Sequence, residues 1–309
     1  MAQDFEVWTP KRPRLKEKDT IMNGRARIAA FAVALAGMVF YMSGCRQLEA
    51  RDQLNKGVDA YKSAQYEEAI DHFQRATELD PTLAMAKTYL ATALAQNVVP
   101  GLDSPENLRT AQRAITIFKE VLAKDPSDIN SVKQIAGIYF SIASRSNPTE
   151  WLQNLENAKR WQMKVLALDP QDPDAAYTIG VIDWTEAHQD LLDALQPAGL
   201  NDDGEGNVKA PRKLMEQVKT ETAPLVEEGM KYLQMAIADR PNYDDDMAYL
   251  NLMYRSKADV DYGDAKAVKA DLANAEKWRV DAMNTRKENE AKKNKGPQGI
   301  TMGAGGSQQ

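Results

Sequence analysis

The stretch Gly57–Pro81 has apolar residues at the spacing of two short helices joined by a tight turn. Its small residues let two helix backbones approach closely, and its large apolar residues fill the space between the pair. Pro81 ends the second helix, because proline has no N–H and clashes with the preceding turn. The residues at these positions are Gly57, Ala60, Tyr61, Ala69, Phe73, Ala76 and Pro81. The pattern therefore predicts a helix–turn–helix unit.

This spacing resembles the tetratricopeptide repeat, whose period is about 34 residues and whose pattern is W-x2-L-G-x2-Y…A-x3-F…P. The match holds from Gly57 onward, whereas Gln53 and Lys56 stand where the repeat has Trp and Leu. The resemblance implies an all-α solenoid of the tetratricopeptide-repeat type with about five helix pairs. Each pair buries too little apolar surface alone and is stabilised by stacking on its neighbours.

Four further units follow when the frame of the first is laid along the chain, and their terminal prolines are Pro126, Pro170 and Pro241, the last unit having none. The prolines lie further apart than the repeat period, which predicts insertions between the two helices of a repeat. Ser104-Pro105 and Asn147-Pro148 each indicate an N-cap followed by proline at the first helical position. The predicted solenoid spans residues 45–285, with repeats at about 50–83, 84–128, 129–172, 173–243 and 244–285. Residues 286–309 are predicted to be a charged end and a disordered tail.

Residues 1–44 are predicted to be a signal peptide or an N-terminal anchor. A basic flank precedes the apolar run Ile28–Met42, which ends at Ser43-Gly44-Cys45, and this layout is that of a secretory signal. The run is shorter than the about 20 residues that span a bilayer comfortably. Met22 would start a signal of ordinary length, which indicates a true start there; a long basic n-region is the alternative.

The ending of this run resembles the bacterial lipobox, in which the cysteine is lipidated, although Met42 stands where Leu is usual. The resemblance implies lipidation at Cys45 and a membrane anchor, because several acyl chains on one residue anchor stably. Arg46, rather than Asp, follows the cysteine. By the same resemblance the protein is expected at the cell envelope, on the outer membrane facing the periplasm rather than on the inner membrane. An uncleaved anchor with Cys45 as an ordinary thiol is the alternative.

Composition argues against several classes of partner and of functional site. The formal net charge of −6 argues against a nucleic-acid partner, since phosphate contacts need clustered Lys and Arg. The chain has one cysteine and two histidines, which leave little for a metal site or a His-based catalytic centre. His188 has acidic neighbours in the sequence, but no second His or Cys supports a metal or general-base role. We therefore expect no enzyme activity, no metal and no cofactor.

In tetratricopeptide repeats the first helix of each pair lines a concave groove, so the resemblance implies a partner-binding groove here. The positions expected to contact a partner are Leu54, Val58, Tyr61, Phe140, Tyr177, Val181, Trp184 and Arg255. They form an apolar and aromatic stripe, which suits an extended or helical segment of a protein partner. Leu54 and Val58 stand where repeats that grip chaperone carboxylates place Lys and Asn, so that specialisation is not expected. The alternative is that neighbouring helices or the insertions cover these aromatic residues.

The largest insertion, at about residues 186–222, contains the acidic loop Asn201–Asn207. The loop lacks the alternating ligands and the distal Glu of an EF-hand, so we expect a solvated hairpin tip rather than a calcium site. The insertion is expected either to pack on the solenoid or to form a second interaction surface.

Taken together, the sequence predicts a lipid-anchored scaffold that binds other envelope proteins, in the assembly of an envelope complex. The alternative is a regulatory or recruiting module for an envelope enzyme that acts on the cell wall or in export.

Overall fold

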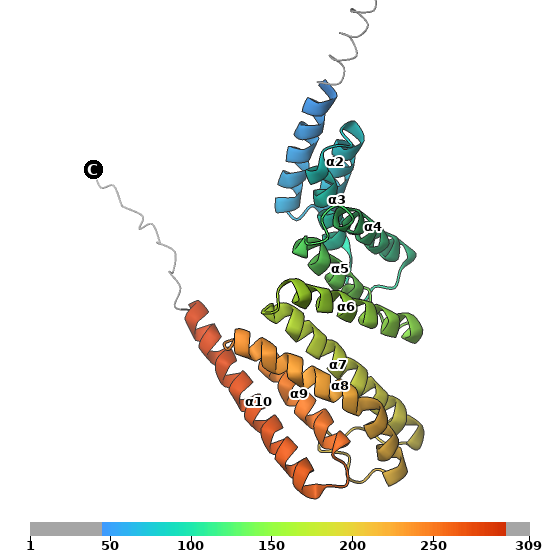
Figure 1. Cartoon of the computed structure of the whole chain (residues 1–309), viewed down its shortest axis with the longest axis vertical. Coiled ribbons are helices and arrows are strands. Elements are labelled where there is room, and N and C mark those ends of the chain that lie inside the picture. The colour runs from blue at the N-terminus through green and yellow to red at the C-terminus, as the bar shows by residue number, and fades with distance from the viewer. Residues whose placement is uncertain (1–44, 295–309) are drawn as a thin grey trace, which may run out of the picture. The chain divides into compact units, whose positions relative to one another are not determined.

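The described residues of the protein, in a computed structural model, are 45–294, and within that range all regular elements are helices (Figure 1). The prediction of an all-α solenoid is confirmed for this part of the chain. The predicted signal or anchor over residues 1–44 lies outside it, as does the part of the predicted charged end and tail (286–309) that follows residue 294. None of the helices in the described part is both long enough and apolar enough to cross a bilayer.

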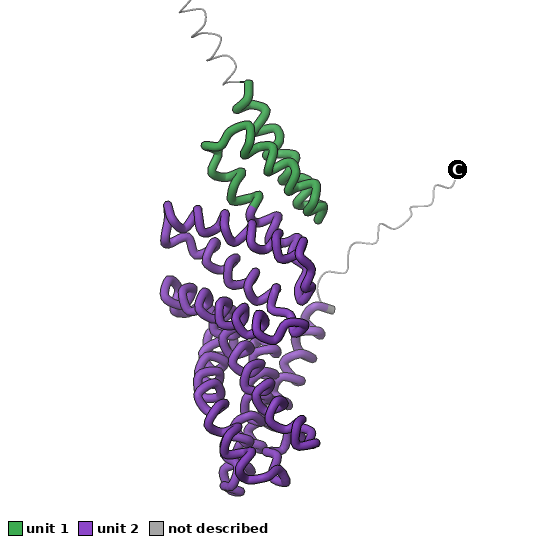
Figure 2. The backbone as a smooth tube through the Cα atoms, turned by 90° about the vertical axis from the view of Figure 1, so that its right-hand side faces the viewer, with its two compact units in different colours: residues 1–90 green, residues 91–309 purple. Residues whose placement is uncertain are grey.

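Two compact units divide the chain between Leu90 and Ala91, within the helix α3 (Ala84–Asn97), as Figure 2 shows. The first unit contains the helix over residues 45–62, α2 (Tyr66–Leu79) and the start of α3. Between the first two helices, Ala64 takes a left-handed conformation with a φ of 58°, and the Gln65 N–H donates to the Ala60 carbonyl at 3.0 Å. This local bonding closes the turn that the sequence predicts.

Close packing of the first pair depends on Gly57 and Phe73. Phe73 is buried, and a Cβ atom added at Gly57 would lie 2.6 Å from its ring. Ala69 and Ala76 of α2 are also buried. The small residues therefore allow the approach that the sequence pattern predicts, and Phe73 fills the space.

The second unit contains the remaining described helices (Figure 1). They are α4 (Pro105–Leu122), α5 (Ile129–Ser141), α6 (Pro148–Leu168), α7 (Pro173–Leu195), the short η1 (Gln196–Ala198), α8 (Arg212–Asp239), α9 (Asp244–Val260) and α10 (Ala265–Asn294). Each α-helix from α4 onward packs against the next, and α7 also contacts α9. Such nearest-neighbour packing is what stacked helix pairs require.

Helix ends follow the local signals. The Ser104 and Asn147 side chains accept hydrogen bonds from the backbone N–H groups of Asn107 and Glu150, so both predicted N-caps are confirmed. The four terminal prolines each lie in the turn after a helix and before the next predicted repeat. In three of these turns the preceding aspartate accepts from the N–H two residues later: Asp80 from Thr82, Asp125 from Ser127 and Asp169 from Gln171.

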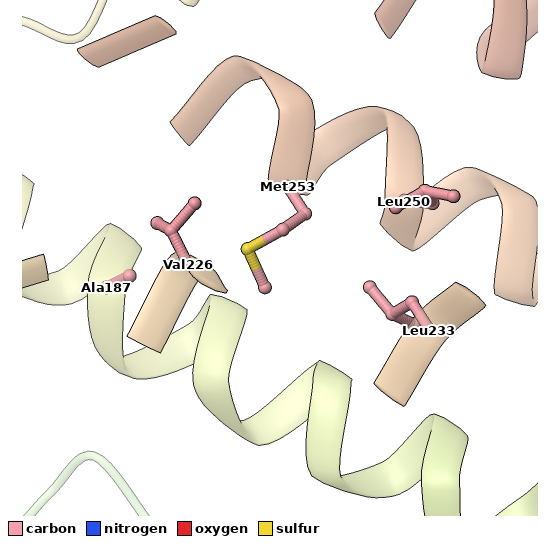
Figure 3. Close-up of a cluster of buried hydrophobic side chains, with 5 residues drawn as sticks. All are labelled: Ala187, Val226, Leu233, Leu250 and Met253. Atoms are coloured by element: carbon pink, nitrogen blue, oxygen red, sulfur yellow. The ribbon is translucent and has the colours of Figure 1, made fainter. Parts of the chain in front are cut away.

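The core of the second unit is a series of clusters between successive helices. In one cluster, Ala187 of α7, Val226 and Leu233 of α8, and Leu250 and Met253 of α9 gather at one place (Figure 3). α7 and α8 approach closely in this region, because Gly180 and Gly229 have no side chain to separate them. Three successive helices thus share one core, and α7 is fixed against both α8 and α9.

The insertion of the fourth predicted repeat is a lengthened helical hairpin. α7 and α8 have 23 and 28 residues, and their added turns meet in a core cluster of their own. The cluster comprises Leu191, Leu195, Ala210, Met215 and Val218. α10 also runs past residue 285, the predicted end of the last repeat, through the charged stretch to Asn294. Within that stretch, Arg286 pairs with Asp244 of α9.

Candidate functional site

In the first unit, the helix over residues 45–62 carries Cys45 and three of the residues predicted to contact a partner. Cys45 is exposed. Leu54 is only 8% exposed, because it shares the inward face of its helix with Ala50 and Gly57. Leu54 is therefore part of the core in this structure and presents no surface to a partner. Val58 and Tyr61 are half-buried.

In the second unit, Phe140 of α5 is 39% exposed, whereas Val181 of α7 is 6% exposed. Val181 lies in the part of α7 where every residue from Ile179 to Asp183 is buried. It belongs to the core like Leu54. Tyr177 and Trp184 of α7 pack against a core cluster and are half-buried, so they keep both core contacts and a surface. Arg255 of α9 is also half-buried.

Five rings in the second unit make a continuous set of contacts, which we call the aromatic row: Tyr243, Tyr177, Tyr249, Trp184 and His188. The Tyr177 ring centroid lies 6.2 Å from that of Tyr243 and 5.6 Å from that of Tyr249, both edge-on. Trp184 meets Tyr249 edge-on at 5.5 Å and stacks on His188 at 5.1 Å with an angle of 10° between the rings. Edge-on and stacked pairs stabilise such a set beyond its buried area.

The row follows from helix geometry. Tyr177, Trp184 and His188 are seven and then four residues apart, so they lie on one face of α7. Tyr249 comes from α9, which contacts α7 directly, and Tyr243 precedes the first turn of α9. Tyr177, Trp184 and Tyr249 also pack against the buried cluster of Figure 3. The row is thus the half-exposed surface of that core.

One end of the row, at Tyr243, is strongly charged. The Arg240 guanidinium lies 3.6 Å from the Tyr243 ring centroid, and it pairs with Asp174 at 2.6 Å and Asp246 at 3.1 Å. Asp246 is completely buried, and this burial raises the pKa of its carboxyl to about 6 despite the arginine. Beside Tyr243, a surface hollow of about 550 Å³ is lined by residues of both signs, among them Asp245, Arg286 and Lys292.

The other end of the row, at His188, meets the acidic loop. The His188 Nδ1 atom lies 3.8 Å from Asp202 Oδ2, and Arg255 donates from Nη1 to the Gly204 carbonyl at 2.8 Å. Gly206 and Asn207 are buried, so the expectation of a solvated tip is wrong for this half of the loop. These two residues are buried because the loop packs on α9, and composition alone does not reveal this packing. Arg255, predicted to contact a partner, holds this loop instead.

The polar groups of the aromatic row are three tyrosine hydroxyls, the Trp184 indole N–H and the His188 imidazole. Burial raises the pKa of the Tyr177, Tyr243 and Tyr249 hydroxyls, so all three stay neutral at ordinary pH. Within residues 45–294, no group of three or more His, Cys, Asp or Glu side chains is arranged to hold a metal ion. Half-buried Tyr and Trp residues combine an apolar ring with a polar tip, which is the character of binding hot spots.

Sequence analysis identified Tyr177 and Trp184 of the row but not its other members. Tyr249 is not among the positions expected to contact a partner, and Tyr243 lies in the turn before α9. For His188, the sequence alone suggests only a metal or general-base role, which no second His or Cys supports. The available signal was the spacing of His188 from Trp184, since residues four apart share a helix face.

The tetratricopeptide-repeat family model matches residues 50–83 of this chain. No curated protein sequence matches it. Among solved structures, MamA from Desulfovibrio magneticus RS-1 is 17% identical, with a TM-score of 0.49, covering 78% of this chain and 97% of that one. A thermophilic TPR protein from Thermus thermophilus is 15% identical, with a TM-score of 0.39, covering 78% and 97%. YrrB, described as a TPR protein with an unusual peptide-binding site, is 12% identical, with a TM-score of 0.43, covering 77% and 90%.

Proposed function

Because this chain is a tetratricopeptide-repeat protein, and such folds are protein-interaction scaffolds, we propose that it binds an extended segment of a partner protein along the aromatic row. This fold class is in general non-catalytic. The supporting observation is the row itself, which joins the first helices of two successive predicted repeats through ring-to-ring contacts. Tyr177, Trp184 and Tyr249 pack against the buried core on one side and are partly exposed on the other.

Preorganisation is the physical reason to assign binding to this surface. Each ring of the row is restrained by its neighbours, so little side-chain entropy remains to be lost when a partner binds. Aromatic side chains restrained in this way supply much of the binding energy in protein interfaces. The hollow beside Tyr243 would accept polar or charged groups of the same segment.

Peptides selected from a random library on the full-length protein test this proposal. We expect Trp184→Leu combined with Tyr177→Leu to weaken their binding about thirtyfold or more, the effect of losing a hot spot of about 2 kcal/mol. Leucine keeps apolar contact with the core but removes both rings from the row. The measurement is a titration of labelled peptide followed by fluorescence anisotropy, with thermal unfolding recorded for each variant.

Tyr232→Leu is the matched control. Tyr232 is a half-buried aromatic residue of α8 that lies outside the row and donates its hydroxyl to Met163 Sδ at 3.3 Å. We expect it to leave peptide affinity within about twofold. Peptides that bind the double variant as tightly as the wild type would show that the row is not the binding surface.

We further propose that Cys45 is lipidated and holds this scaffold at the bacterial cell envelope, where its partners would be other envelope proteins. The support is the order of basic, apolar and small residues before Cys45, together with the exposure of this residue at the start of the described helix. Assembly of an envelope complex and an outer-membrane position facing the periplasm belong to the same proposal.

Metabolic labelling with a fatty acid in a bacterial host tests the anchor. We expect the wild-type protein to incorporate the label and to partition with membranes, and Cys45→Ser to lose the label, because the thiol is the acceptor atom. Processing after residue 44 should appear in the mass of the mature protein. Label retained by Cys45→Ser, or absent from the wild type, would contradict lipidation at this residue.

A further inference from the structure

The acidic loop Asn201–Asn207 is attached to α9 through one side chain. Asn207 is only 4% exposed, and its Nδ2 atom donates to Asp202 Oδ1 at 2.9 Å and to Asp259 Oδ1 at 2.8 Å. Its Oδ1 atom accepts from the Asp203 N–H at 3.2 Å. Both the Nδ2 and the Oδ1 atom of Asn207 are therefore hydrogen-bonded, and the amide lies between carboxylates of the loop and of α9.

Asp259 is a buried carboxyl group that no basic side chain among the described residues pairs with. It is 4% exposed. From the loop, Asp202 and Asp203 add negative charge, and from α9 itself Arg255 is engaged with the Gly204 carbonyl.

Within residues 45–294, the other neighbouring elements place no basic group against Asp259. From α8, the charge of Lys219 acts on Asp261 rather than on Asp259. From α7, His188 faces Asp202 rather than Asp259. From α10, Val268 lies against Gly206, and Asp271 is paired with Lys257. Asp259 thus depends on one neutral donor, the Asn207 amide.

Protonation of Asp259 is consequently linked to docking of the loop. Burial, and then the charges of Asp202 and Asp203, raise its pKa to about 7, although the Asn207 hydrogen bond opposes this. A carboxyl with a raised pKa favours the docked form fully below its solvent-exposed pKa and progressively less as pH rises toward 7. Between these values the opening constant rises about tenfold per pH unit if opening fully hydrates the group.

The loop also touches the candidate binding surface. His188 stacks on Trp184 and lies 3.8 Å from Asp202, so the docked loop contacts this end of the aromatic row. We propose that the acidic loop is a pH-sensitive strap over the His188 end of the row, docked while Asp259 is protonated and released when Asp259 ionises. Its consequence for binding rests on the proposed function, since release would open His188 and Trp184 to a partner.

Hydrogen–deuterium exchange of the full-length protein at pH 5 and pH 8, corrected for intrinsic rates, tests the strap. In the wild type, we expect protection of peptides covering residues 201–210 to fall at least about tenfold at pH 8. Asp259→Asn keeps an acceptor for the Asn207 amide and cannot ionise, so its protection should change less than about twofold. The exposed Asp239 gives the matched control, because Asp239→Asn should behave as the wild type.

A second variant imitates the released form. Gly206 has a φ of +88°, and a Cβ atom there would lie 3.0 Å from Val268 and 3.3 Å from the Ala258 carbonyl. Gly206→Ala should therefore leave the loop unprotected at both pH values.

The strap is overturned if wild-type protection does not fall, if Asp259→Asn loses protection as the wild type does, or if peptides covering Leu250–Met253 lose it equally, which is global opening. This measurement needs no partner, so it is independent of whether the aromatic row binds peptides.

Discussion

Replacing Lys159 with methionine is expected to lower the free energy of unfolding by about 3–5 kcal/mol, the cost of removing one partner from a buried ion pair. Lys159 of α6 contacts Asp183 of α7 at 2.5 Å and Glu228 of α8 at 2.7 Å. Asp183 is completely buried, and its Oδ2 atom already has no hydrogen-bond partner. Methionine keeps the apolar stem of the side chain but leaves the buried carboxyl uncompensated.

The loss should depend on pH in a defined direction. Burial raises the pKa of Asp183 to about 7 even though Lys159 opposes the shift. Stability from a carboxyl with a raised pKa is complete at low pH and is lost as pH rises through the folded-state value. At pH 5 the carboxyl is largely protonated, whereas at pH 8 the variant must bury a charge or take up a proton. Urea unfolding at both values should therefore show the larger deficit at pH 8.

Arg160→Met is the control for Lys159→Met. Arg160 is the next residue of α6, is exposed, and bonds only to the nearby Asn157 among the described residues. Its replacement should change the free energy of unfolding by about 0.5 kcal/mol or less. If Lys159→Met costs no more than Arg160→Met, or costs more at pH 5 than at pH 8, the buried pair does not stabilise the fold as described.

Local signals explain why the helices could be predicted. Ser104 and Asn147 cap helices with atoms three residues away, and each terminal proline acts on its own turn. Gly57 and Phe73 lie 16 residues apart within one predicted unit, so their contact follows from the repeat pattern. Interactions within one helix or one hairpin require particular residue types at short, fixed spacings. Such spacings can be recognised in the sequence.

The candidate site depends on contacts that spacing does not encode. Tyr177 and Trp184 follow from the frame of the repeat, but Tyr249 joins them only because α9 packs against α7. Leu54 and Val181 occupy frame positions of the predicted groove, yet both are buried. The side on which a helix is covered depends on the helices that pack against it, and spacing within one helix does not identify those neighbours.

Charged residues were the least predictable. Lys159 of α6 and Glu228 of α8 are 69 residues apart in the sequence, and folding brings them into contact at 2.7 Å. The acidic loop has the composition of a solvated tip, but its Asn207 is buried against Asp259. The sequence does not show whether a charged residue is buried or exposed, so only the packed structure distinguishes the two cases.

Gly180→Val is expected to lower the free energy of unfolding by about 3 kcal/mol, the upper range for overpacking a core. A Cβ atom at Gly180 would lie 2.5 Å from Leu233 Cγ and 3.2 Å from the Gly229 carbonyl oxygen. Leu233 is fully buried in the cluster of Figure 3, and a backbone carbonyl cannot turn away as a side chain can. α7 and α8 must therefore move apart, which also disturbs the support of the aromatic row.

Gly137→Ala is the control for this substitution, since Gly137 lies within α5 and no atom comes within 4 Å of its added Cβ. Alanine is the better helix former, so we expect this variant to be about 0.5–1 kcal/mol more stable than the wild type. Urea unfolding followed by circular dichroism measures both variants. Opposite signs for the two glycines would establish that α7 and α8 meet at Gly180, and a Gly180→Val variant as stable as the wild type would contradict that contact.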